Sequence, residues 1–309
     1  MLAYFFTVDQ QILTMFLMVA AGYLLYRFRV LTEHGLAELS QLLLKIVTPM
    51  VLLTSFQREF SKEVFFDWVV MFLVSALLYA VHILAARIVY RDIDAPRCAE
   101  SRLAVAFPNN GFMAIPLMLA LAGETGVFLG STNIILLNIL FWTYGSRTLS
   151  PGEPIRTKQI LQNPGLIAVV LGLLLLFSPV KLPEPIYQVV YQIGFLNTPL
   201  AMLVLGGFLA QADLKAIFKT PAYLQLSALK LLALPCILIG LLYLLPLSRE
   251  VKMVAAICSV TPTATAVSML ANVYHRDVSF ASGAVVITTL ISAVTIPVMM
   301  TLAKMLLQF

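Results

Sequence analysis

Charged residues are scarce in this chain. They make up 11% of its 309 residues, whereas 61% are hydrophobic and the mean hydropathy is +0.95. Soluble domains carry about 25% charge, so this shortage excludes a soluble globular domain and predicts a membrane protein with several crossings. The formal net charge of +5 then reflects basic residues in short loops, where they set topology, and indicates no nucleic-acid partner.

Cysteine and catalytic motifs are also scarce. Cys98, Cys236 and Cys258 are scattered, form no CxxC pair and indicate neither a disulfide framework nor a metal or cofactor site. The sequence contains no HExxH or GxSxG motif, and no His within an apolar run lies at a depth compatible with the serine candidates Ser131 and Ser282. These absences disfavour a membrane-embedded enzyme.

Long apolar runs are abundant. A crossing requires about 20 mostly apolar residues. Ten such runs lie near residues 9–28, 38–56, 64–90, 100–122, 127–146, 163–180, 186–211, 221–247, 251–274 and 279–306. The first run is too long for a signal-peptide core and no basic residue precedes it, so we expect no cleavable signal peptide.

Basic residues concentrate in the odd-numbered connections between these runs, for example in residues 91–102 and 147–158. The positive-inside rule therefore places these loops in the cytoplasm and both chain ends outside it. The chain is expected to be a multi-pass protein of the plasma membrane, in a bacterium the inner membrane.

Two of the runs are interrupted near their centres by proline and polar residues. Pro108-Asn109-Asn110-Gly111 lies within residues 104–119, and Thr261-Pro262-Thr263-Ala264-Thr265 lies within residues 255–270. Proline inside a helix costs about 3 kcal/mol, and unsatisfied backbone groups in hydrocarbon cost several kcal/mol each. Both helices are therefore predicted to break at mid-depth, where irregular backbone must be buried in protein or line a cavity.

The interruptions occur in matching positions of two halves. Thr48-Pro49 and Thr198-Pro199 mark runs 2 and 7, and the interrupted runs are runs 4 and 9, each pair about 150 residues apart. Five runs per half means that the second half enters the membrane inverted. The sequence predicts an all-α integral membrane protein with two inverted five-helix repeats, at 1–146 and 163–309, joined by a cytoplasmic linker at 147–162.

A broken helix exposes amides where its second half begins and carbonyls where its first half ends. Half-helices starting after Asn110 and Thr263 would aim their amides at mid-membrane, where low dielectric strengthens their attraction for an anion. The polar side chains at the breaks either cap these ends or bind the ligand; they are Asn109, Asn110, Thr261, Thr263 and Thr265. Gly111 is interpreted as serving the shape of the backbone.

Other polar residues within the runs have two interpretations each. The Thr48 and Thr198 hydroxyls either satisfy a carbonyl freed by a kink or contact substrate, and Asn197 is the stronger substrate candidate because an in-span amide requires a partner. Lys45 and Lys230 are either substrate counter-ions or snorkelling side chains.

Two asparagines in run 5, Asn133 and Asn138, are expected to hold the broken helix by hydrogen bonds. His82 and His275 are weak candidates for proton coupling. No Asp or Glu falls in the middle of any run, which disfavours a buried carboxylate as an ion ligand.

The segments PNNGFMAIPL and TPTATAVSML resemble those of the auxin efflux carrier family, in particular its bacterial organic-anion permeases, and the likeness covers essentially the whole chain. The resemblance implies the fold of bile-acid sodium symporters and sodium/proton antiporters. It also implies a scaffold of helices 1, 2, 6 and 7, a transport domain of helices 3–5 and 8–10, elevator-type alternating access, and a homodimer formed through the scaffold. The crossover prolines would be Pro108 and Pro262, with scaffold contacts near Thr48 and Asn197.

The sequence thus predicts a secondary carrier for a small organic anion such as a mono- or dicarboxylate. The alternative is a ligand sensor that keeps the transporter fold but moves nothing. The shortage of in-span carboxylates favours proton coupling or uncoupled transport over sodium coupling.

Overall fold

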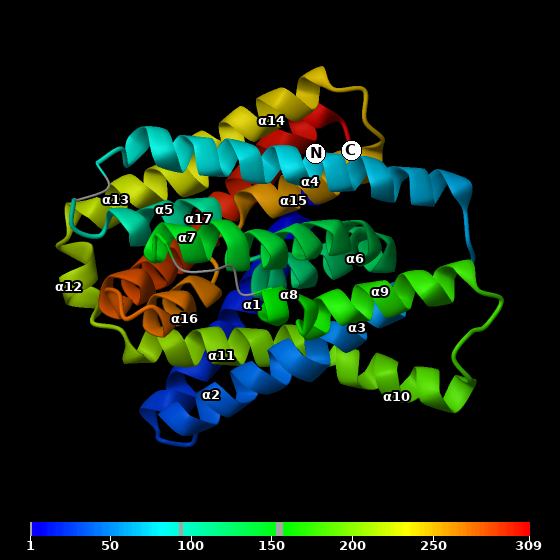
Figure 1. The fold of residues 1–309 in the computed structure, drawn as a ribbon, viewed down its shortest axis with the longest axis horizontal. Coiled ribbons are helices and arrows are strands. Elements are labelled where there is room, and N and C mark those ends of the chain that lie inside the picture. Colours follow the sequence, from blue (N-terminus) through cyan, green and yellow to red (C-terminus); the bar gives the residue numbers. More distant parts are fainter. Residues whose placement is uncertain (1, 93–94, 153–156) are drawn as a thin grey trace.

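Helices joined by short loops make up the protein. The computed structural model describes residues 2–92, 95–152 and 157–309 (Figure 1). The first half contains α1 (Leu2–Arg27), α2 (Glu33–Leu42), η1 (Leu43–Val47), α3 (Thr48–Ser55), α4 (Lys62–Val89), α5 (Cys98–Ala106), η2 (Asn110–Ala114), α6 (Ile115–Leu140), η3 (Phe141–Gly145) and α7 (Ser146–Leu149). The second half contains α8 (Thr157–Leu161), α9 (Pro164–Phe177), α10 (Glu184–Phe195), α11 (Asn197–Gln211), α12 (Leu214–Phe218), α13 (Pro221–Ala228), η4 (Leu229–Ala233), α14 (Leu234–Leu244), α15 (Arg249–Val260), α16 (Ala266–Val273) and α17 (Val278–Leu307).

The expectation of an all-helical membrane protein is confirmed. Six helical stretches of the described residues are long and apolar enough to cross a bilayer: Glu33–Ser55, Lys62–Val89, Asn110–Leu149, Glu184–Gln211, Pro221–Leu244 and Val278–Leu307. A shorter apolar helix spans Pro164–Phe177. The count of ten crossings and their inverted symmetry stay a prediction, and residues 153–156 of the predicted linker lie outside the described residues.

Both interruptions are present in the backbone. Helix α5 ends at Ala106 and η2 begins at Asn110, while α15 ends at Val260 and α16 begins at Ala266. A second change of direction occurs within α6 at Gly123, whose φ of 60° and ψ of −155° suit glycine. The backbone at Gly123 is not helical, so the segment α6 consists of two helices joined by a kink, and the kink lies where the predicted runs 100–122 and 127–146 separate.

Close backbone contacts hold one group of helices together. A Cβ added to Gly206 of α11 would lie 2.0 Å from the Val19 carbonyl oxygen of α1, and one added to Gly22 would lie 2.2 Å from the Leu203 carbonyl oxygen. Helix α3 also packs on glycines: the Phe56 side chain after α3 occupies the space that a side chain at Gly172 of α9 would need, and a Cβ added to Gly194 of α10 would lie 3.1 Å from the Val51 nitrogen. Small residues let membrane helices approach this closely.

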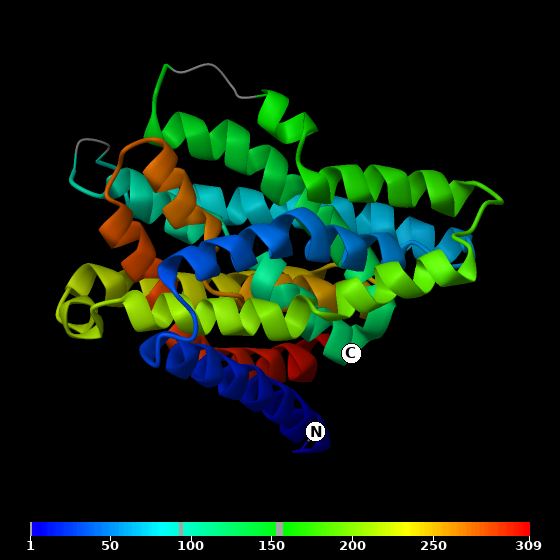
Figure 2. The same cartoon turned by 90° about the horizontal axis from the view of Figure 1, so that it is seen from below.

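A second group of helices surrounds the interruptions. Helix α6 packs on α4 and α15, and α17 packs on α13, α14, α15 and α16. Figure 2 shows α1 at one edge of the molecule beside α17, where the two groups also touch. The interruptions are therefore enclosed by protein, as irregular backbone at membrane depth requires.

Candidate functional site

The two interrupted segments meet and pair with each other. Pro108 and Thr263 form an antiparallel bridge. The amide of Asn109 donates to the Pro262 carbonyl at 2.7 Å, and the amide of Ala264 donates to the Phe107 carbonyl at 2.9 Å. These bonds satisfy backbone groups that the broken helices would otherwise leave unpaired, and they fix the two breaks to one another.

The carbonyl end of α5 receives donors from distant parts of the chain. The Thr263 hydroxyl donates to the Ala104 carbonyl at 2.9 Å, and the Lys230 ammonium donates to the Val105 carbonyl at 2.8 Å. Lys230 is 0% exposed. Of the two interpretations of Lys230, substrate counter-ion or snorkelling side chain, snorkelling is therefore wrong: its amine nitrogen lies at the negative end of a half-helix, where a positive charge is stabilised.

The amide end of the first break is only partly satisfied. The Asn109 carbonyl oxygen Oδ1 accepts from the Phe112 amide at 3.2 Å, which is an N-cap contact. Its Nδ2 is buried and has no partner among the described residues. A Cβ added to Gly111, two positions further along the chain, would meet no atom within 4 Å, so open space borders this half-helix.

Gly111 differs from our interpretation in one respect. It does not belong to the residues with positive φ and lies in the helical turn η2. The backbone therefore requires no glycine here, and the open space beside Gly111 is the feature that distinguishes it.

Asn110 is the centre of a hydrogen-bond network. Its Nδ2 donates to the Tyr79 hydroxyl at 3.4 Å and to the side-chain oxygen Oδ1 of Asn133, and its Oδ1 accepts from the Thr261 hydroxyl at 3.2 Å. Tyr79 also donates to Asn133 at 2.9 Å. Because both ends of the Asn110 side chain have partners, a substrate would have to displace one of them. Asn133 holds the broken helix as the sequence suggested, whereas Asn138 instead bonds Asn163 at the start of α9.

The second break has a different arrangement. The Thr263 amide donates to the Thr288 hydroxyl of α17 at 3.1 Å, so both polar groups of Thr263 are used within the protein. Thr265 precedes α16, is partly exposed and lines a cavity. Of the polar residues in this segment, Thr265 is the one with access to that cavity.

Thr48 and Asn197 face each other across the two halves. The Asn197 Nδ2 donates to the Thr48 hydroxyl at 3.0 Å, and both side chains are buried. Thr48 thus accepts from an amide, a partner that neither interpretation of its hydroxyl, as a donor to a carbonyl freed by the kink or as a substrate contact, had included. The Asn197 Oδ1 keeps no partner among the described residues. This pair ties α3 to the start of α11, and the unpaired oxygen leaves Asn197 free to accept from a ligand.

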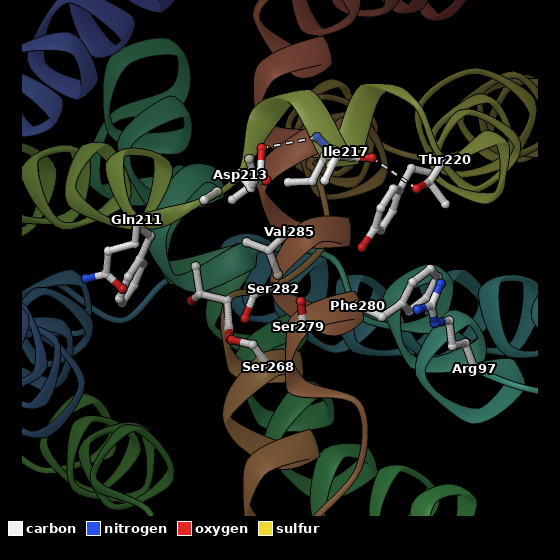
Figure 3. Close-up of a pocket in the computed structure, with 17 residues that line it drawn as sticks. Arg97, Gln211, Asp213, Ile217, Thr220, Ser268, Ser279, Phe280, Ser282 and Val285 are labelled. Carbon is white, nitrogen blue, oxygen red and sulfur yellow. Dashed lines mark hydrogen bonds between the residues drawn. The ribbon is translucent and has the colours of Figure 1, made fainter.

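A cavity of about 570 Å³ reaches the second break (Figure 3). Helix α11 and the following loop contribute Gln211 and Asp213, and α16 and α17 contribute Ser268 and Ser282, which Figure 3 shows near the centre of the view. Arg97 lies at one side, where its guanidinium bonds Asp277 at 2.9 Å and stacks over Phe280 at 5.1 Å. The lining is mostly hydroxyls and apolar side chains, with one cation and one anion.

A second cavity, of about 610 Å³, approaches the first break. Pro116 and Gly123 of the segment after η2 line one side, and Thr54 of α3 and Thr198 of α11 line the other. Each cavity is thus bordered by the second half of one broken helix and by α11.

The sequence profile of the membrane transport protein family matches residues 7–159 and 153–300. The chain belongs to this family of membrane transporters, the auxin efflux carrier family. Over 299 residues it is 25% identical to an uncharacterized transporter of Methanothermobacter thermautotrophicus, which covers 93% of this chain and 96% of the relative. It is 23% identical to an uncharacterized transporter of Methanocaldococcus jannaschii, over 92% of this chain and 95% of the relative.

Sequence reasoning missed several residues at the crossing of this membrane transport protein. Tyr79 and Thr288 were not singled out, because a lone hydroxyl in an apolar helix gives no signal of which distant backbone group it will meet. Lys230 was singled out as an ionisable residue within an apolar run, but the Val105 carbonyl that accepts its hydrogen bond lies 125 positions away in sequence. For a protein of this family, the transported substrate and the bilayer are the implied partners, and the family is not enzymatic.

Proposed function

We propose that this membrane transporter is a secondary carrier for a small organic anion, such as a mono- or dicarboxylate. The observation that carries the proposal is the pairing of the two broken helices between Asn109 and Pro262, which brings the amide end of a half-helix and an unpaired buried Asn109 amide to one place. Buried polar groups are normally hydrogen-bonded, so an unpaired donor beside open space suits an acceptor such as a carboxylate.

The substrate is proposed to bind between the crossing and α11. Asn109 donates from the crossing and Thr265 reaches the first cavity. Asn197 lies at the start of α11, where its unpaired oxygen would accept from a hydroxyl of the substrate or from a water bound beside the carboxylate. Volumes of about 570 and 610 Å³ are ample for a small carboxylate and fall in the range of ligand pockets. Asn110, Thr261 and Thr263 hold the geometry, and Thr48 positions Asn197.

Alternating access is proposed to be elevator-like. The glycine-mediated packing of α1 on α11 and of α3 on α9 and α10 supports a rigid scaffold, against which the helices around the crossing would slide. The two cavities lie where such sliding would open one route and close the other. We place the Thr265 cavity on the cytoplasmic side, because Arg97 and the loops around it belong to the basic connections.

The remaining features of the proposal follow from the family resemblance. Both chain ends would lie outside the cytoplasm of a plasma membrane, and two copies would associate through their scaffolds. Oligomeric state in a mild detergent, measured by light scattering, tests the dimer directly.

The decisive experiment is transport by purified protein in liposomes. A thermal-shift screen against mono- and dicarboxylates, pyruvate and malonate included, selects ligands, since a ligand that binds the folded state raises the apparent stability. Uptake of the labelled ligand is then compared between wild type and Asn109→Ala. A hydrogen bond to a charged group contributes about 1.5–3 kcal/mol, so we expect about a 10- to 100-fold weaker apparent affinity in the variant.

Asn163→Ala is the matched control. Asn163 caps α9 by accepting from the Leu166 amide at 3.1 Å and donates to Asn138 at 2.8 Å, so its removal costs a similar N-cap contact and one further hydrogen bond away from the crossing. We expect wild-type affinity in this control. Equal transport by wild type and Asn109→Ala, or ligand binding without any flux, would contradict the proposal, and the second result would favour a sensor.

A further inference from the structure

Lys230 is a buried basic side chain with fewer partners than an ammonium group normally has. Its side chain is 0% exposed and makes one hydrogen bond, to the Val105 carbonyl. An ammonium group has three donors, and buried charges are ordinarily paired. The ion pairs among the described residues are His34 with Glu38 and Arg97 with Asp277, so Lys230 belongs to neither.

The helices packed around Lys230 supply no acid near it. His82 of α4 is buried and close enough to interact electrostatically with Lys230; its Nδ1 contacts the Leu78 carbonyl at 2.7 Å, while its Nε2 has no partner among the described residues. Cys258 and Tyr79 are the other buried titratable side chains near the crossing. The remaining titratable or charged residues of α4, α5, α13, α14, α15 and α17 lie toward the helix ends or on exposed surface, and they are Lys62, Glu63, Asp67, Arg87, Cys98, Glu100, Arg102, Tyr223, Cys236, Tyr243, Arg249, Glu250, Lys252 and Lys304.

Capping alone does not require a lysine at this place. The preceding carbonyl of α5, that of Ala104, is satisfied by the neutral Thr263 hydroxyl. The other lysine in a π-helical turn, Lys45 of η1, is exposed and bonds Gln41 at 2.9 Å. An ionisable group is therefore buried at the crossing even though a neutral hydroxyl satisfies the carbonyl one residue earlier.

We propose that Lys230 carries the proton that this transporter moves together with its anion. The inference rests on the proposed function. In the loaded state Lys230 is protonated and remains on the Val105 carbonyl, so that one proton crosses together with the anion without a contact between the ammonium and the carboxylate. After the anion leaves, Lys230 passes one proton to water on that side, the empty carrier returns with a neutral amine, and water on the first side supplies the next proton.

The cycle moves one proton and one anion in the same direction. For a monocarboxylate the moved charges cancel, and for a dicarboxylate one negative charge remains. A lysine withdrawn from water can lose its proton within such a cycle, whereas arginine keeps its charge. This contrast makes Lys230→Arg and Lys230→Gln informative together.

The test uses the full-length protein in liposomes that contain a pH-sensitive dye, with labelled pyruvate as the monocarboxylate and malonate as the dicarboxylate. In wild type we expect uptake of either probe to acidify the lumen, and pyruvate uptake to rise with an acidic exterior and to be insensitive to membrane potential. In Lys230→Arg and Lys230→Gln we expect exchange of internal for external probe to persist, coupled acidification to be lost, and pyruvate uptake to become sensitive to potential. Lys45→Gln, the matched control, should behave as wild type.

Every other outcome contradicts either the inference about Lys230 or the proposed function. Net uptake of pyruvate and malonate by wild type without acidification contradicts the inference and leaves the proposed carrier intact. Acidification that persists in either Lys230 variant assigns the proton to another group. Loss of exchange in Lys230→Arg also counts against the inference, because a residue that only carries the proton is dispensable when no net proton moves. No exchange of either probe by wild type contradicts the proposed function itself.

Discussion

Replacing Asn110 with alanine tests whether Asn110 supports the structure of the crossing while Asn109 binds the ligand. Asn110 links Tyr79, Asn133 and Thr261, which come from α4, α6 and the segment after α15. Asn109, its neighbour, has one bonded side-chain atom and one unpaired atom. We expect Asn110→Ala to destabilise the protein strongly, and Asn109→Ala to destabilise it weakly while impairing ligand binding.

The magnitude follows from the bonds that are lost. Hydrogen bonds in membrane proteins contribute roughly 0.6 kcal/mol each on average, and those in soluble proteins about 1 kcal/mol. Three bonds therefore give about 2–3 kcal/mol for Asn110→Ala. Asn133 and Thr261 keep other partners, Tyr79 and the Cys258 carbonyl, which argues against a larger loss. Asn109→Ala removes one N-cap, which costs about 1 kcal/mol.

Unfolding in detergent micelles, followed by circular dichroism, measures both values, and ligand-induced thermal shifts measure binding at a temperature where both variants are folded. A stability of Asn110→Ala equal to that of wild type would refute the assigned network. A loss in Asn109→Ala as large as that in Asn110→Ala would refute the separation of support from binding.

Two glycine substitutions test the packing and the first cavity. Gly206→Ala would place a Cβ 2.0 Å from the Val19 carbonyl oxygen, so we expect a loss of about 3 kcal/mol by the same unfolding assay, whereas Gly240→Ala, in open space, should be neutral or stabilise by up to about 1 kcal/mol. Gly283→Ala would meet the Tyr223 hydroxyl at 2.2 Å and turn that flexible side chain, so we expect slower transport with nearly unchanged stability; transport at the wild-type rate would show that this cavity is not the route.

The interruptions could be predicted because their signal is local. A proline next to polar residues in the middle of an apolar run interrupts the helix at the position of the proline, and the two breaks lie at Pro108 and Pro262. The kink at Gly123 also has a local signal, because it lies in the gap between two apolar runs. Its positive φ is a conformation that glycine adopts readily.

The partners at the crossing could not be predicted in the same manner. Lys230 and Val105 are separated by 125 positions, and Asn197 and Thr48 by 149. Hydropathy places each of these residues in a run but does not fix the rotation or depth at which two runs touch. The charge of Lys230 was visible in the sequence, and its use as a helix cap follows only once the two helices are packed.

The caps of the two broken helices differ in charge, and this difference favours an anion at the crossing. The carbonyl end of α5 receives the Lys230 side chain, which is positive when it is protonated. The carbonyl end of α15 receives a neutral donor, the Thr261 hydroxyl at 3.2 Å from the Cys258 carbonyl, and the Pro262 carbonyl just beyond this helix receives the Asn109 amide. The amide ends add partial positive charge. With no acidic residue in the middle of any predicted run, the sum is positive, and a carboxylate would bring it toward neutrality without an arginine at the site.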